Sequence, residues 1–546
     1  SGGNNKTTYR LSLGYMAQDA IVKSKFKSER YNLSFNLNSK VKNWLKISSV
    51  TNAFWKRNEG PTGGQNAFSG DNGIIYSFQR AAPTIPAYYS NGNYGIVDGA
   101  YYNDNPSYLT QNPIRRGYLG NYESDNINIS QRLGFSLNLT KDLTFETSGS
   151  ANIIYSNVSD FSPTTILYDW EGNIVASNEL NTLKNSTNFQ YRLLNENILK
   201  YTKSFNDVHN FGLLLGHSVS YYKTDNFNGQ LSGFPTNNLE EFNAGGVVDP
   251  AVAGSALEET YQSFFGRINY DYDGKYLAEF NLRRDGSSKF NSQNRYGNFP
   301  SASVGWRISR ENFMQSISFI NNLKLRASWG VSGNDRIGNY IYAQTYNPGI
   351  DYVLGDDNTV TGVALTSLAN PSIKWEETEQ YDIGLDLGMF NNKLDIVADY
   401  FNRNSTDILY TNFPIPNTLG VTTLEAQNAA SMVNTGLEFG VNYRDNINEN
   451  LSFSLGASLT KFLNNEVTGL GEGGEETITN TNIIRVGEPY MAYYGYKAIG
   501  IFQSLEEIAN SPTQFGNANT GPGDIRYADI SGSNGIPDGV VDDNDR

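Results

Sequence analysis

The sequence predicts an all-β protein whose strands form a transmembrane antiparallel β-barrel. Aromatic residues make up 13% of the 546 residues, although the hydrophobic fraction is only 38%. Apolar and polar residues alternate along many segments, and the connections between these segments alternate between short and long. This combination suits strands with one apolar and one polar face, rather than a disordered chain or a helical enzyme core.

Alternation of apolar and polar residues with a period of two marks the expected strands. Clear cases are residues 9–15, 31–37, 133–139, 323–329, 381–387 and 437–443. We count about 15–16 such strands, most of them about 10–16 residues long, whereas strands of soluble proteins usually have about 5–6 residues.

The lengths of the connections between the expected strands indicate the fold class more specifically than the alternation does. Short turns are expected near residues 39–42, 140–142, 204–207, 272–275, 391–393 and 445–450. Long loops are expected at about residues 56–123, 157–187, 224–257, 332–375, 403–432 and 465–483. Short turns at one end of the strands and long loops at the other are typical of bacterial outer-membrane barrels. A soluble β-sandwich, the alternative, has no reason to separate its loops in this way.

Charged residues occur in mid-strand between apolar neighbours, on the polar phase of the alternation. They are Arg10, Arg132, Glu146, Glu279, Arg283, Lys324, Arg326, Asp382, Asp386 and Glu438. On a lipid face each would cost about 2–4 kcal/mol near the midplane, and less for the acidic residues. We therefore expect these side chains to face a wet lumen or a polar plug.

Composition excludes several classes of function. The formal net charge of −15 argues against nucleic acid as a partner, and the absence of cysteine excludes disulfides and thiol chemistry. Of the two histidines, His217 falls on the apolar phase with Leu213 and Leu215, which favours a structural role. The run at residues 469–474 matches GxGxxG by letters but opens no helix, so no dinucleotide site is expected. No pair of catalytic carboxylates stands out, and we expect no enzyme activity.

The first long loop is dense in aromatic and amide side chains. The candidate ligand-binding residues are Tyr88, Tyr89, Asn91, Asn93, Tyr94, Tyr101, Tyr102 and Asp104. Aromatic faces stack on the C–H surfaces of sugars, and Asn and Asp bond hydroxyl groups, so the loop could form part of a glycan site. The alternative is that these residues only pack the loop or contact a partner.

Several segments, in this order, resemble the SusC/RagA-type TonB-dependent outer-membrane transporters of Bacteroidetes. They are residues 1–15, 280–290 (FNLRRDGSSKF), 295–308 (RYGNFPSASVGWRI), 325–334 (LRASWGVSGN), 370–376, 399–410 and 434–438. The resemblance covers the chain from end to end.

The resemblance implies part of a 22-stranded barrel in the bacterial outer membrane, with the N-terminal plug and about six final strands outside this chain. It implies a SusD-type surface lipoprotein as a lid, and energy from TonB-ExbB-ExbD through the plug region. The expected function is import of nutrient oligomers, most of all oligosaccharides, with outer-membrane lipid around the barrel. An oligopeptide importer of the same family and a surface adhesin or glycan-binding protein without transport are the alternatives.

The last segment resembles an Asp-rich loop of this family with spacing like that of an EF-hand. Asp529, Asp538, Asp542 and Asp545 are the candidate ligands for Ca²⁺, the one cofactor considered. Residues 531–537 separate the first two aspartates and no glutamate ends the loop, so an acidic loop without metal is an equal alternative.

Overall fold

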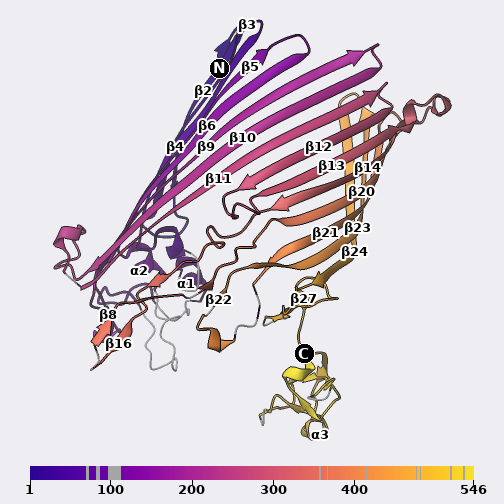
Figure 1. The fold of residues 1–546 in the computed structure, drawn as a ribbon. Coiled ribbons are helices and arrows are strands. Elements are labelled where there is room, and N and C mark those ends of the chain that lie inside the picture. The colour runs from indigo at the N-terminus through magenta and orange to yellow at the C-terminus, as the bar shows by residue number, and fades with distance from the viewer. Residues whose placement is uncertain are drawn as a thin grey trace. The chain divides into compact units, whose positions relative to one another are not determined.

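The structure, a computed structural model, is described in two compact units that are mainly antiparallel sheet (Figure 1). The units are Ser1–Lys203 with Gly212–Gly266, and Ser204–Phe211 with Arg267–Arg546. The described residues are 1–68, 73–80, 86–95, 112–246, 248–355, 358–365, 367–411, 413, 416–421, 423–474, 476–479, 481–516, 519–532 and 535–546.

Long strands in chain order make up each unit. In the first unit they are β1 (Gly2–Gly3), β2 (Thr7–Asp19), β3 (Lys27–Lys42), β4 (Leu45–Gly60), β5 (Asn121–Asn138), β6 (Leu143–Ser162), β9 (Thr182–Phe205), β10 (His209–Ser232) and β11 (Val248–Tyr272), the last three extending a few residues into the second unit. In the second unit they are β12 (Tyr276–Ser287), β13 (Tyr296–Arg307), β14 (Ile320–Asn334), β20 (Glu376–Met389), β21 (Leu394–Tyr410), β23 (Gln427–Asn448) and β24 (Leu451–Gly469). The sixteen strands of the main sheet confirm the predicted all-β class and strand number.

Connections alternate in length in the first unit, whereas in the second unit the connection of residues 288–295 between β12 and β13 is shorter than that of residues 308–319 between β13 and β14. β3 and β4 are joined through residues 43–44 and β23 and β24 through residues 449–450, whereas residues 61–120 join β4 to β5. At the turn between β11 and β12, Asp273 and Gly274 have φ angles of 54° and 62°, a left-handed conformation that Asp and Gly tolerate.

The strands extend into all six of the expected loops, and they extend furthest into three of them. β6 ends at Ser162 and β9 begins at Thr182, inside residues 157–187; β11 begins at Val248, inside residues 224–257; and β21 ends at Tyr410, inside residues 403–432. The ends of β6, β9 and β21 carry polar residues on both faces, and the start of β11 is mostly Ala, Val and Gly, so the alternation that marks a strand is lost although the strand continues.

Small elements occupy the connections. They are η1 (Gly64–Phe68), α1 (Ile74–Arg80), α2 (Pro113–Tyr118), β7 (Thr165–Tyr168), β8 (Ile174–Asn178), η3 (Phe242–Ala244), η4 (Ile308–Arg310), η5 (Asn312–Met314), β15 (Asn347–Pro348), β16 (Tyr352–Leu354), β17 (Asn358–Val360), β18 (Val363–Ala364), β19 (Ser367–Leu368), η6 (Asn417–Leu419) and β22 (Thr423–Leu424). After β24 follow β25 (Thr477–Ile478), β26 (Asn482–Ile484), β27 (Ala492–Tyr493), β28 (Ala498–Ile501), α3 (Leu505–Ala509), β29 (Thr513–Gln514), β30 (Ile525–Tyr527), β31 (Val540–Val541) and η7 (Asp543–Asp545). Among the described residues, no helix is both long and apolar enough to cross a membrane.

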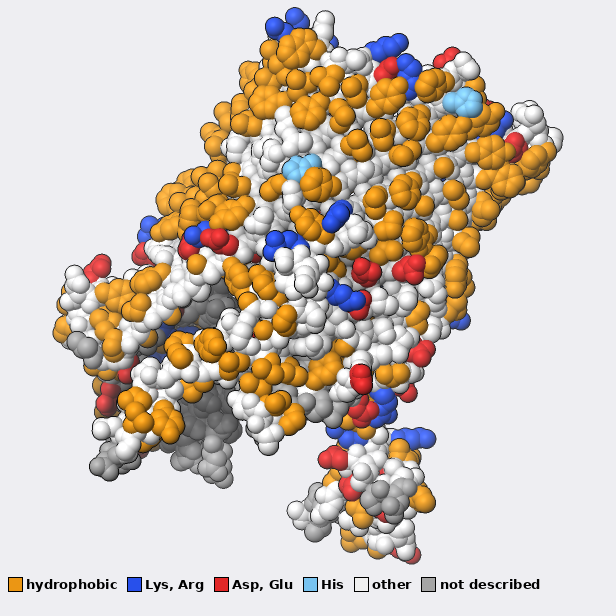
Figure 2. Space-filling model, in the orientation of Figure 1, with side chains coloured by type: hydrophobic (Ala, Val, Ile, Leu, Met, Phe, Trp, Pro, Cys, Tyr) orange, Lys and Arg blue, Asp and Glu red, His pale blue; other side chains and the backbone are white. Residues whose placement is uncertain are grey.

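The long strands expose their apolar phase. Leu13 on β2 is 75% exposed and Ile383 on β20 is 57% exposed. Figure 2 shows apolar side chains crowding the visible face of the strands. A soluble sheet would bury this face, so its exposure indicates that lipid covers it.

Buried apolar residues gather instead at the strand ends next to the long connections. Phe161, Leu183 and Phe234 form one such cluster in the first unit. In the second unit, one cluster consists of Phe290, Phe299, Ile373 and Trp375, and another of Tyr410, Ala430, Val467 and Leu470. The long loops are therefore anchored by small cores of their own.

The assignment of faces predicts opposite effects for two neighbouring residues of β14. Leu325 lies on the exposed apolar face, in register with Trp306 and Leu385. Leu325→Arg should therefore reduce assembly, because an arginine on the lipid face costs about 2–4 kcal/mol near the midplane. Heat-modifiable mobility of the full-length protein in outer-membrane fractions measures the assembled share.

Arg326→Leu is the matched control, since Arg326 lies on the polar face of the same strand and should be replaceable without loss of assembly. Equal assembly of the two variants would show that the faces are assigned wrongly.

Candidate functional site

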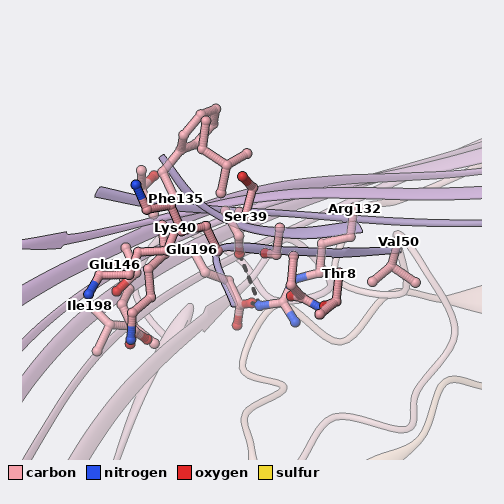
Figure 3. Close-up of a pocket in the computed structure, with 18 of the residues that line it drawn as sticks. Thr8, Ser39, Lys40, Val50, Arg132, Phe135, Glu146, Glu196 and Ile198 are labelled. Atoms are coloured by element: carbon pink, nitrogen blue, oxygen red, sulfur yellow. Dashed lines mark hydrogen bonds and ion pairs between the residues drawn. The ribbon is translucent and has the colours of Figure 1, made fainter. Parts of the chain in front are cut away.

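The polar face of the first unit is hollowed near the short turns. A cavity of about 570 Å³ lies between side chains of β2 to β6 and β9 (Figure 3). Arg132 forms an ion pair with Glu196 across the cavity wall, with a distance of 3.4 Å from Nη2 to Oε2. Lys200 and Glu146 form a second pair at 2.6 Å. The mid-strand charges of this unit therefore lie where the sequence predicts, on the polar face.

The polar face of the second unit carries a similar, smaller cavity of about 360 Å³. Glu279, Lys324, Arg326 and Asp382 line it. The guanidinium of Arg326 lies 3.2 Å from Asp386 and 2.6 Å from Asp399, so one arginine joins three neighbouring strands. Ion pairs as exposed as these contribute about 0–1 kcal/mol each. Their main effect is to keep charges satisfied on a face that stays wet.

The described part of the first long loop places two candidate ligand residues side by side. Tyr88 and Tyr94 pair as an isolated bridge, and their ring centroids are 5.0 Å apart. Tyr88 is exposed, whereas burial, together with its neighbour Tyr88, raises the pKa of the Tyr94 hydroxyl. The pair presents an aromatic surface with two hydroxyl groups.

The other candidates in this hairpin shape its turn. The backbone N–H of Tyr89 donates to the Asn93 carbonyl at 2.7 Å, and the Asn91 side chain accepts the N–H of Asn93 at 3.0 Å. Asn91 therefore acts first as a turn residue. The candidates Tyr101, Tyr102 and Asp104 lie outside the described residues.

A buried asparagine fastens this hairpin to α2. The Asn112 side chain caps α2 by accepting the N–H groups of Ile114 and Arg115. The same side chain donates to the carbonyls of Ala87 and Gly95, both at 3.0 Å. One side chain thus holds the start of the helix against both ends of the hairpin.

The α2 helix adds Arg115 near Tyr94 and Arg116 near Asp160, and the sequence analysis did not single these arginines out. Burial lowers the pKa of both Arg115 and Arg116, and neither forms an ion pair within the described part of the chain. Asn112 followed by Pro113 could have predicted the start of this helix, because an N-cap residue followed by proline in the first turn is typical of a helix N-terminus.

The predicted calcium ligands lie near the C-terminus of the chain, and their carboxylates turn toward the backbone. Asp545 is fully buried and accepts the N–H groups of Ile530, Ser531 and Asp542 at 2.7–2.9 Å. Asp529 accepts the N–H of Gly539, and Asp538 that of Val540. No three metal-binding side chains gather among the described residues. Calcium binding through Asp529, Asp538, Asp542 and Asp545 stays a prediction.

Comparison with known proteins decides the family. The family model described as "TonB dependent receptor-like, beta-barrel" matches residues 76–535. The chain belongs to this family of TonB-dependent receptors. It therefore carries the barrel wall of a protein of the bacterial outer membrane, and the family consists of transporters rather than enzymes.

Relatives support the same membership. TonB-dependent receptor P3 of Formosa agariphila is 31% identical over 549 residues, which are 98% of this chain and 52% of that protein. TonB-dependent receptor SusC of Bacteroides thetaiotaomicron is 28% identical, over 87% of this chain and 47% of SusC. The chain thus spans about half the length of the curated relatives it matches.

A solved structure shows the fold independently. The structure of the RagAB peptide transporter matches 99% of this chain and 56% of the matched chain, with a TM-score of 0.79 and 23% identity. The family model and the curated relatives, together with this fold, confirm the SusC/RagA-type resemblance seen in the sequence.

Asp545 predicts an acid-sensitive segment in this receptor barrel. Its three backbone hydrogen bonds lower the pKa of its carboxyl group below the ordinary value of 3.8. The charged carboxylate of Asp545 therefore stabilises the folded segment fully above a pH of about 4. This stabilisation is lost as the pH falls through the lowered pKa. Amide protection factors in residues 498–546 of the full-length protein, which correct for the pH dependence of intrinsic hydrogen exchange, should therefore fall in acid.

Asp545→Asn removes the charge, and should accelerate exchange in this segment at neutral pH and flatten the acid response. Asp538→Asn, at an exposed aspartate with one backbone bond, is the control and should change little. Equal exchange in both variants would contradict the role assigned to Asp545.

Proposed function

We propose that this chain is the wall of a TonB-energised importer that brings nutrient oligomers, above all oligosaccharides, across the outer membrane. Family membership over residues 76–535 carries the proposal. The transport activity belongs to the whole protein, with a plug inside the barrel that TonB pulls to open a path.

The cluster formed by Tyr88, Tyr94 and α2 supports a role of the first long loop in holding cargo. A tyrosine pair offers a flat apolar surface that matches the C–H face of a sugar ring, and hydroxyl and amide groups beside it bond sugar hydroxyls. Asn112 fixes the hairpin against α2, which reduces the entropy lost when a ligand binds. These features favour an oligosaccharide as cargo.

The partners follow from the same family. A SusD-type surface lipoprotein would cover the long loops and pass cargo to them, and TonB-ExbB-ExbD would supply energy from the inner membrane. The solved RagAB protein is titled a peptide transporter, so peptides are the alternative cargo that an experiment must separate from glycans.

Deletion of the gene in its native host tests the transport proposal. The deletion strain should lose growth on one class of oligosaccharide, and uptake of that labelled glycan should stop while growth on monosaccharides continues. Loss of growth on peptides alone would replace the glycan assignment with peptide import. Loss of surface binding without loss of uptake would favour an adhesin.

The tyrosine pair predicts a measurable share of cargo affinity. Replacing both Tyr88 and Tyr94 by Ala should weaken binding of the growth-supporting oligosaccharide roughly tenfold, because each aromatic contact contributes about 0.5–1.5 kcal/mol. Calorimetry on the purified full-length protein with its lipoprotein measures the Kd.

Trp170→Ala is the control, since Trp170 is an exposed aromatic residue in the hairpin of β7 and β8, outside the cluster. If only the control variant loses affinity, the loop of residues 61–120 is not the cargo contact.

A further inference from the structure

A row of positive charges on the polar face of the first unit lacks acidic partners. This cation row consists of Arg10 on β2, Arg30 and Lys40 on β3, and Lys46 and Lys56 on β4. Within the described part of the chain, none of these side chains forms an ion pair. The whole chain has a formal net charge of −15, so its composition does not explain unpaired cations gathered on one face.

The alternation along the strands places the cation row on the polar face. Tyr31 is exposed on the apolar face of β3, so its neighbour Arg30 points to the other face. Trp55 is exposed on the apolar face of β4, and its neighbour Lys56 points to the polar face for the same reason.

Two pairs within the cation row lie directly opposite each other. The register of β3 and β4 pairs Arg30 with Lys56 and Lys40 with Lys46. Like charges at directly opposite positions repel each other and destabilise a sheet. Such pairs therefore do not contribute to the stability of the wall, whereas an anion that lies between the two cations would relieve their repulsion.

Neighbouring side chains order Arg30 without neutralising it. Its Nε donates to Asn32 Oδ1 at 2.8 Å, and its guanidinium carbon lies 4.2 Å from the centroid of the Phe54 ring. Glu29, the acidic residue next to it in the chain, lies on the apolar face and accepts a hydrogen bond from Tyr15. The terminal nitrogens of Arg30 bond no other group among the described residues, so they can donate to a ligand.

The second unit shows a different arrangement where two cations are neighbours on its polar face. Lys324 and Arg326 on β14 both pair with Asp386 on β20, and Arg326 also pairs with Asp399 on β21. This wall can therefore neutralise neighbouring cations with its own carboxylates. The pairs on β3 and β4 are not neutralised in this way.

The two opposed pairs lie near opposite ends of the same strands. Arg30 and Lys56 lie near the end of β4 at Gly60, where the long connection of residues 61–120 begins. Lys40 and Lys46 lie beside the short connection of residues 43–44 and line the cavity of about 570 Å³ (Figure 3). The acidic residues of that cavity are held in the two ion pairs described above.

Neutral polar side chains fill the distance between the two pairs. Ten residues of β3 separate Arg30 from Lys40, which corresponds to about 34 Å. The residues of the polar phase between them are Asn32, Ser34, Asn36 and Asn38. Arg10 on β2 lies opposite Asn36, part of the way along this path. Amide and hydroxyl groups both donate and accept hydrogen bonds, as the hydroxyl groups of a sugar require.

We propose that the cation row binds the acidic groups of an anionic oligosaccharide, so that the cargo carries carboxylate or sulfate groups. This inference rests on the proposed function and adds the charge of the cargo to it. Hydrogen bonds between cations and anionic oxygens are stronger than those between neutral groups. Cations spaced along a strand match acidic groups that recur along a linear chain, and the amides between them match its hydroxyl groups. A neutral glycan would leave the repulsion between Arg30 and Lys56 in place.

The double variant Arg30→Gln, Lys56→Gln tests the cation row by calorimetry on the full-length protein with its lipoprotein. The probes are oligogalacturonate, its neutral methyl ester, and a sulfated galactose oligomer of the same length. The wild-type protein should bind at least one acidic probe more tightly than the ester. The double variant should bind that acidic probe roughly tenfold more weakly and should bind the ester unchanged.

The double variant Lys27→Gln, Lys223→Gln is the matched control. It removes the same charge from the first unit, but both lysines lie on the apolar phase of their strands, β3 and β10. The control should therefore bind the acidic probe as the wild-type protein does.

Thermal stability separates a binding role from a structural one. Because Arg30→Gln, Lys56→Gln removes a repulsion, its heat-modifiable mobility should be lost at the same temperature as in the wild-type protein or a higher one. A lower temperature, together with an equal loss of affinity for all probes, would show that the cations hold the protein itself, such as its plug, and would overturn the proposal.

Two further outcomes distinguish this inference from the proposed function. If the wild-type protein binds neither acidic probe, or binds the ester equally well, the anionic class is wrong while glycan import stands. If the deletion strain keeps its growth on all oligosaccharides, acidic ones included, the proposed function fails and the assignment of the cation row fails with it.

Discussion

Backbone pairing across a lipid environment is the constraint on which this structure depends. A chain that crosses hydrocarbon must satisfy every backbone N–H and C=O group internally, and neighbouring antiparallel strands do so through an unbroken ladder. Because side chains alternate along each strand, the register of that ladder decides which residues face lipid. A slip of one residue would send Arg326 to the lipid face and Leu325 to the polar face.

The same constraint explains where apolar packing occurs. The wall has lipid on one face and a wet surface on the other, so it has no room for a conventional core. Apolar side chains such as Phe290 and Trp375 instead bury themselves where strands end and loops begin. Ion pairs between neighbouring strands satisfy the charges of the polar face. Arg326 on β14, for example, pairs with both Asp386 on β20 and Asp399 on β21.

The sequence predicts the wall far better than the loops. The alternation around Leu11, Leu133 and Ile383 is a local property of each strand, so it can be read without knowledge of distant contacts. The hydrogen bonds from the Asn112 side chain to the carbonyls of Ala87 and Gly95 link residues far apart in the sequence, so no local pattern predicts them.

The small cores at the loop bases have an evolutionary consequence. Since the cluster of Phe161, Leu183 and Phe234 holds its loop bases through its own contacts, mutations beyond these bases leave the wall untouched. Lineages can therefore exchange or lengthen loops while they retain one scaffold. Relatives that share about a third of their residues with this chain can therefore differ in their loops while their strands insert into the membrane in the same way.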